Sequence, residues 1–94
     1  MNIRITEKAY LDLEHIRSYI GKDNIEKAKE VARSILIHTN NQLAVPAHGK
    51  KGLIEDTYEL KVPKLPYIVV YRIKNTQYEI LHIYHQKQYR GTTV

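Results

Sequence analysis

The sequence contains no cysteine, and its apolar residues never form a run long enough to cross a bilayer. Without cysteine there is no disulfide framework, and without roughly 20 consecutive apolar residues there is no membrane span. No charged segment followed by an apolar stretch opens the chain, so nothing predicts a secretory signal. These absences predict a cytoplasmic protein without a membrane partner.

Several common catalytic motifs are also missing. The chain has no phosphate-binding loop, no dinucleotide-binding glycine pattern, no serine elbow and no cysteine nucleophile. His82 and His85 are three residues apart in an expected strand, so they should point to opposite faces and make a poor pair of metal ligands. We therefore expect neither a metal ion nor another cofactor.

The residues that are present suit one small globular domain, which we expect to span 1–94. The apolar fraction is 43%, and 15 Lys and Arg residues against 10 Asp and Glu residues give a net charge of +5. Most of the excess lies in the C-terminal half. A basic chain suits a polyanion such as nucleic acid or an acidic protein, although a basic surface can also serve solubility alone.

A short strand and a helix are predicted at the N-terminus. Ile3 and Ile5 alternate with polar neighbours, which is typical of a half-buried strand, and Thr6 is suited to cap a helix. Apolar residues then recur with helical spacing over 7–20, and Gly21 is placed to end this helix in a left-handed conformation.

A second helix is predicted to follow almost at once. Asp23 and Glu26 have the spacing of a capping box, and helical periodicity continues until the polar run 39–42. A linker of about three residues forces the two helices to fold back as an antiparallel hairpin.

The C-terminal half predicts strands over 58–62, 67–73 and 78–84, after a basic surface loop over 46–51. Strict alternation in the last strand would put Leu81 and Ile83 on one face. The opposite face, partly in contact with water, would carry Tyr78, Ile80, His82 and Tyr84. The order of elements indicates an α+β fold, in which a short strand and a helical hairpin pack on a largely antiparallel four-stranded sheet.

Two segments resemble the RelE/ParE toxin superfamily. The first is PYIVVYR at 66–72, followed by Ile80, Leu81 and His85, which is similar to the C-terminal hairpin of that family. The second is the helical frame DLxxIxxYI, which contains Leu13, Ile16, Tyr19 and Ile20. The resemblance covers nearly the whole chain.

The resemblance implies the toxin of a type II toxin–antitoxin module, with a cognate antitoxin as partner and a toxin–antitoxin hetero-oligomer as the assembly. RelE-like members cleave messenger RNA in the ribosome, whereas ParE-like members poison DNA gyrase and lack the cleavage residues. Metal-free RNA cleavage is slightly favoured. The alternatives are a gyrase poison without nuclease activity and a non-toxic binding module that represses transcription with its antitoxin.

RNA cleavage by this route would need a proton-transfer group, cations for the phosphate and an acid for the leaving oxygen. His85, Arg72 and Tyr89 are the expected catalytic residues. Phosphate contacts are expected from four cations, namely Lys50, Lys51, Lys87 and Arg90.

Each of these residues also has a structural interpretation. His85 would be a partly buried structural histidine, Arg72 would pair with Glu59 or Glu79, and Tyr89 would dock back on the sheet. The sequence also departs from the family pattern, because Tyr58 stands where arginine is frequent.

Overall fold

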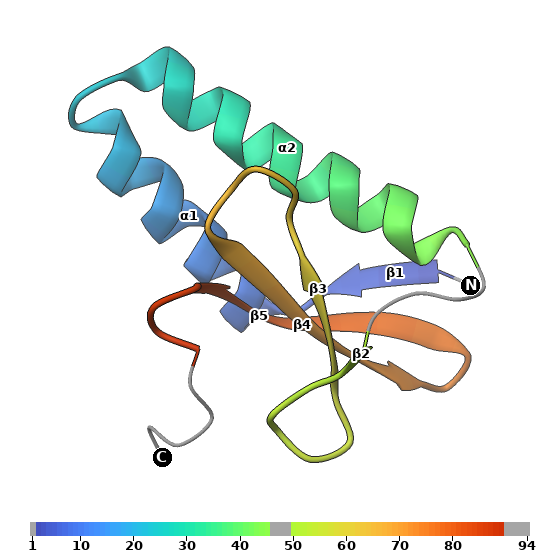
Figure 1. The fold of residues 1–94 in the computed structure, drawn as a ribbon. Helices are drawn as coiled ribbons and strands as arrows, with labels where there is room; N and C mark the ends of the chain where they lie inside the picture. Colours follow the sequence, from blue (N-terminus) through green and yellow to red (C-terminus); the bar gives the residue numbers. More distant parts are fainter. Residues whose placement is uncertain (1, 46–49, 90–94) are drawn as a thin grey trace.

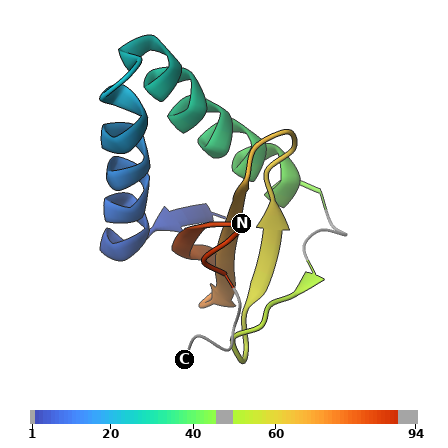
Figure 2. The ribbon, with the colours of Figure 1, turned by 60° about the vertical axis from the view of Figure 1, so that its left-hand side comes forward.

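In a computed structural model, which describes residues 2–45 and 50–89, two helices lie on one side of a sheet (Figure 1). Seen from the side, the helices meet at the short linker and diverge from it (Figure 2). The elements are β1 Asn2–Ile5, α1 Glu7–Gly21, α2 Ile25–Leu43, β2 Lys50–Lys51, β3 Tyr58–Lys61, β4 Tyr67–Lys74 and β5 Gln77–His85. The expected α+β architecture is confirmed. No helix in the described ranges is long and apolar enough to cross a membrane.

The sheet has five strands in the order β1-β5-β4-β3-β2, one more than the sequence predicts. β1 runs parallel to β5, and the other three neighbouring pairs are antiparallel. The additional strand is β2, where Lys50 pairs with Glu59 and Lys51 pairs with Tyr58. A two-residue strand is too short to show an alternating pattern, so the sequence predicts a loop at these lysines. Residues 46–49 of that loop lie outside the described ranges.

The helix termini follow the predictions closely but not at every cap. The Thr6 hydroxyl accepts a hydrogen bond from the Ala9 N–H at 3.3 Å, as expected for an N-cap. α2 is capped by Asn24 and not by Asp23, because the Asn24 side chain accepts from the N–H of Lys27 at 2.9 Å. Gly21 is the last helical residue of α1 and does not act as a left-handed stop.

An irregularity in the β4–β5 pairing changes which residues of β5 face the helices. Val70 pairs with His82 while the next residue, Tyr71, pairs with Ile80, so Leu81 is an additional residue in β5. Such a bulge shifts the in–out alternation by one position. Ile83 and Ile80 therefore both belong to the core, and the prediction that they occupy opposite faces is wrong.

Tyr67, Tyr71 and Tyr78 belong to the core, and Tyr78, which was expected on a face in contact with water, is 7% exposed. Tyr71 is 1% exposed; its ring stacks on Tyr58 at 5.6 Å and meets Tyr78 edge-on at 5.7 Å. Burial raises the pKa of Tyr71 to about 12. The core beneath the helices also contains Ala9, Leu13, Val31, Ile35, Leu43, Leu60, Val62, Tyr67 and Val69.

Candidate functional site

An open groove of about 460 Å³ lies between α1 and the end of β5. It combines two aliphatic residues, two tyrosines and four residues with polar or titratable side chains. Concave sites of this mixed character are where ligands and partner side chains are usually bound. The lining residues are Asp12, His15, Ile16, Tyr19, Tyr67, Ile83, His85 and Gln88. We call this the α1–β5 groove.

His85 is the last residue of β5 and is held by the turn that follows it. The ring nitrogen Nδ1 accepts a hydrogen bond from the backbone N–H of Lys87 at 3.1 Å. The backbone N–H of His85 donates to Gln88 Oε1 at 3.1 Å. Because Nδ1 is the acceptor, the neutral ring carries its proton on Nε2. The ring meets Tyr67 edge-on, with 5.6 Å between ring centres.

The hydroxyl of Tyr67 supplies a neutral donor in the groove. Burial, reinforced by the neighbouring Tyr19 hydroxyl, raises the pKa of Tyr67. The phenol therefore stays protonated at neutral pH. A protonated tyrosine hydroxyl beside the ring of His85 offers hydrogen-bonding groups to a partner in the groove.

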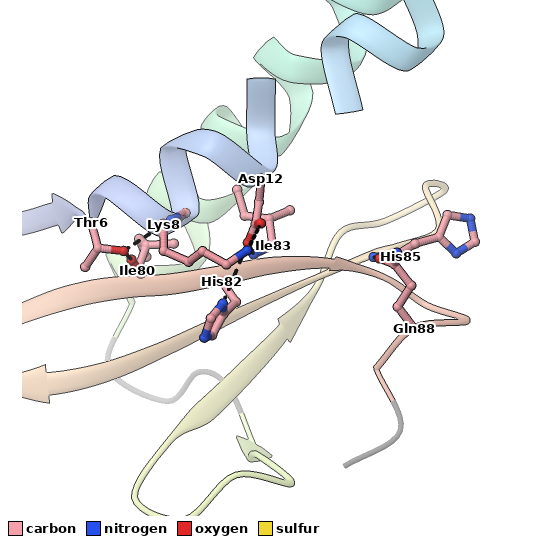
Figure 3. Close-up of polar contacts among 9 residues, drawn as sticks. Thr6, Lys8, Asp12, Ile80, His82, Ile83, His85 and Gln88 are labelled. Atoms are coloured by element: carbon pink, nitrogen blue, oxygen red, sulfur yellow. Dashed lines mark hydrogen bonds and ion pairs between the residues drawn. The ribbon is translucent and has the colours of Figure 1, made fainter. Parts of the chain in front are cut away.

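The edge of β5 next to the groove is closed by a carboxylate from α1 (Figure 3). Asp12 Oδ2 accepts from the N–H of Ile83 at 3.0 Å, and its other oxygen pairs with Lys8. His82 Nδ1 lies 3.7 Å from the same Oδ2 and is buried without a hydrogen bond. In Figure 3 the side chains of His82 and His85 lie on opposite sides of β5, as predicted.

No group of three His, Cys, Asp or Glu residues within the described ranges is arranged to hold a metal ion.

Arg72 lies at the other end of the β4–β5 hairpin. Arg72 Nε donates to Glu79 Oε1 at 2.7 Å, and Arg4 Nη1 donates to the other carboxylate oxygen at 2.9 Å. The hydrogen bond from Arg72 lowers the pKa of Glu79, an effect that burial opposes and that Arg4 and Lys74 reinforce. Glu79 is six residues before His85 on β5, about 20 Å at strand geometry. The structure therefore does not bring Arg72 and His85 together.

Tyr89 docks on the sheet, which is the structural interpretation of this residue. Its hydroxyl accepts from the N–H of Leu53 at 2.7 Å, and its ring stacks on Tyr84 at 5.3 Å. Burial raises the pKa of Tyr89. The hydrogen bond from the Leu53 N–H lowers this pKa, and the nearby Glu59 carboxylate raises it further. The side chain joins the end of the described chain to the segment between β2 and β3.

The predicted phosphate-binding cations are spread over the molecule. Lys50 and Lys51 form the edge strand β2, and Lys50 Nζ lies 3.4 Å from Glu59 Oε1. Lys87 lies in the turn after β5, next to His85. Arg90 is outside the described residues. Of the three cations that the structure describes, Lys87 is the one near the groove.

Sequence reasoning did not identify the contribution of α1 to the groove. Asp12, Ile16 and Tyr19 are spaced four and three residues apart, so they share one face of the helix, and His15 adjoins them. That spacing was visible in the sequence. The sequence predicts a core stripe through Ala9, Leu13, Ile16 and Ile20, but nothing in it shows that the end of β5 packs beside the neighbouring face of this helix.

Three comparisons place this fold among known proteins. The protein-family model described as "ParE toxin of type II toxin-antitoxin system, parDE" matches residues 3–89 of this chain. A curated protein of Sinorhizobium fredii (strain NBRC 101917 / NGR234), named "Putative toxin Y4kP", is 37% identical over 86 residues, which are 92% of this chain and 88% of that protein. The solved structure titled "Chromosomal ParDE TA system from P. aeruginosa" matches with a TM-score of 0.80 and 25% identity, over 90% of this chain and 95% of that one.

The fold and the matches define the class of protein as the toxin component of a type II toxin–antitoxin system. Within that class, the chain belongs to the ParE toxin family. Membership implies a cognate antitoxin as its partner.

Proposed function

We propose that this chain arrests growth by poisoning DNA gyrase and that it does not cleave RNA. The observation that supports this most strongly is the position of Arg72. It is bound to Glu79 at one end of the β4–β5 hairpin, about 20 Å from His85 at the other end. A gyrase poison acts by binding and needs no convergent catalytic set.

RNA cleavage, in contrast, depends on placing several groups around one phosphate. Acid–base groups must be within about 3 Å of the atoms they serve, and cations must face the charge that develops. Here the Tyr89 hydroxyl accepts a hydrogen bond from the Leu53 N–H, and Arg72 donates one to the Glu79 carboxylate. Tyr89 lies in the turn that follows His85, where its N–H donates to the His85 carbonyl at 3.2 Å. Arg72 is the expected catalytic residue that lies apart from the other two.

The family match supports the same choice. The ParE model covers 87 consecutive positions, from residue 3 to residue 89, including the whole β4–β5 hairpin. ParE-like toxins are the branch that the resemblance associates with gyrase. The α1–β5 groove gives such a toxin an amphipathic surface for protein contacts.

RNA cleavage is the second candidate function, and the position of His85 is the observation that favours it. Its ring lines an open groove, and Lys87 follows two residues later. An imidazole that changes charge near neutral pH is a common proton-transfer group. The experiment must therefore separate gyrase poisoning from ribonuclease activity and use His85 as the diagnostic residue.

The test combines purified proteins with growth assays. Gyrase, supercoiled plasmid, ATP and this chain are incubated, and trapped cleavage is measured as linear DNA after protein digestion. We expect linear DNA to accumulate, and we expect His85→Ala to retain poisoning with at most a few-fold loss, because it removes one contact of the groove and no proton-transfer step. His38→Ala, a change of the same type on α2, is the matched control.

Ribosome-dependent cuts in messenger RNA that disappear in His85→Ala, with intact plasmid, would transfer the assignment to RNA cleavage. Normal growth on expression without antitoxin, with soluble folded protein, would instead indicate a non-toxic module that acts with its antitoxin as a repressor.

A further inference from the structure

The net charge of the protein is not shared equally by its two layers. Residues 7–43, which contain both helices, hold six acids and six bases, so the helical layer is neutral. All of the net +5 therefore lies outside the helices. A basic sheet beneath a neutral helical pair points to an anionic partner that approaches the sheet and not the helices.

The basic residues of the sheet are concentrated on the face that the helices leave uncovered. Strand alternation places the residues next to core positions on this side, which we call the open face. It carries five cations and two carboxylates, a net charge of +3. The charged residues of the open face are Arg4, Lys50, Glu59, Lys61, Arg72, Lys74 and Glu79.

Two arginines on the open face are held in place by one carboxylate. Arg4, Glu79 and Arg72 are direct neighbours across β1, β5 and β4, so the arginines are two strand spacings apart, about 10 Å. Their side chains remain 55% and 42% exposed. Arg72 donates to the carboxylate through Nε, which is one of the three nitrogens of its guanidinium.

This geometry suits phosphate groups. A guanidinium that is already oriented loses less rotamer freedom when it binds, and its planar donors match phosphate oxygens. Lys74, beside Glu79, and Lys61, on β3, extend the cationic surface along the sheet. A polyanion with regularly spaced charges can contact several of these side chains at once.

The aromatic rings of the same face favour a double-stranded partner. Binding of single strands relies on aromatic faces that are free to stack on unpaired bases. Here the ring of Tyr84 is stacked between His82, at 5.1 Å, and Tyr89, at 5.3 Å. Tyr89 itself is only 8% exposed. The surface therefore offers charge without a stacking platform.

From these observations we propose that the open face of the sheet binds the phosphate backbone of duplex DNA without reading its sequence. The proposal goes beyond gyrase poisoning and does not depend on it. It assigns Arg4 and Arg72 as phosphate contacts, with Glu79 as the residue that orients them. Lys61 and Lys74 add contacts along the backbone.

The test measures fluorescence anisotropy of a labelled duplex of about 20 bp, titrated with the full chain over a series of salt concentrations. Parent protein should bind with an affinity that falls steeply with salt. Arg4→Gln/Arg72→Gln should weaken binding roughly tenfold and reduce the slope of log K against log salt by about 1.8, or about 0.9 for each lost phosphate contact.

Two further variants make the result specific to this surface. Lys61→Gln/Lys74→Gln leaves the arginine–glutamate row intact and should weaken binding in the same way. Lys27→Gln/Lys29→Gln removes the same charge from α2 and should have a much smaller effect.

Several results would overturn the proposal. One is an equal loss of binding in the α2 variant, since binding would then depend on net charge alone. The others are no measurable binding by the parent, or tighter binding of a single strand or an RNA duplex than of the DNA duplex. Because no gyrase is present, failure here is separate from failure of gyrase poisoning.

Discussion

The carboxylate of Asp12 accepts a hydrogen bond from the backbone N–H of Ile83 at 3.0 Å, which ties α1 to β5 beyond the end of β1. β1 pairs with β5 only as far as Ile80. The Thr6 hydroxyl donates to the carbonyl of Ile80 at 2.7 Å, and Asp12 accepts from the N–H of Ile83 three residues further along β5. Beyond Ile80, α1 therefore lies along the edge of β5 in place of β1.

Asp12→Ala should lower the free energy of unfolding by about 1–3 kcal/mol, because the Ile83 N–H would be left in a partly buried place without its acceptor. Urea denaturation followed by circular dichroism measures the loss. Glu30→Ala, which breaks the exposed Lys27–Glu30 pair, is the control and should cost under about 0.5 kcal/mol. Equal losses in the two variants would show that the Asp12 contact contributes no more than a surface ion pair.

Two glycines should respond to alanine in opposite directions. A Cβ at Gly52 would lie 2.5 Å from Thr57 Oγ1 and 3.1 Å from the Tyr89 hydroxyl, so Gly52→Ala should destabilise the fold by about 1–3 kcal/mol. At Gly21 the nearest atom is the Ala28 Cβ at 3.7 Å, an ordinary contact. Gly21→Ala should therefore stabilise the helix by up to about 1 kcal/mol, measured by thermal unfolding.

A stable Gly52→Ala variant would mean that the segment between β2 and β3 can move away from Tyr89 at little cost.

Stability in acid should depend on Glu79. Its pKa is lowered in the folded state, chiefly by the hydrogen bond from Arg72, so the folded state gains stability above the unfolded pKa near 4.5. This stability is lost as the pH falls through the lower, folded pKa. Urea midpoints recorded from about pH 6 to about pH 3 should fall for the parent and fall less for Glu79→Gln. An equal fall of the urea midpoint in the parent and in Glu79→Gln would show that Glu79 does not govern stability in acid.

Stability in alkali should depend on Tyr71, whose pKa is raised to about 12 by burial. A raised pKa of this kind gives stability that is complete below the unfolded value near 10 and is lost as the pH rises toward 12. In Tyr71→Phe the urea midpoint should fall less than in the parent between about pH 10 and about pH 12. Tyr10→Phe, at a side chain that is 53% exposed, is the matched control.

Local sequence determined most of the elements. Apolar spacing located both helices within one or two residues, Thr6 was identified as a cap, and the β-branched and aromatic runs located β3, β4 and β5. These features depend on interactions between residues that are close in the chain, which periodicity reports directly. The PYIVVYR hairpin also carried the resemblance that the ParE match confirms.

Tertiary structure decided which residues meet. The bulge at Leu81 exchanged the faces of β5, the parallel pairing of β1 placed Arg4 beside Glu79, and α1 brought Asp12 to Ile83. Each of these contacts joins segments distant in sequence or depends on one extra residue in a ladder. Local periodicity contains no information about such pairings, because they are selected by packing of the whole chain. For the same reason the sequence singles out His85 and Arg72 as candidate residues, but only the folded sheet shows that they lie at opposite ends of the β4–β5 hairpin.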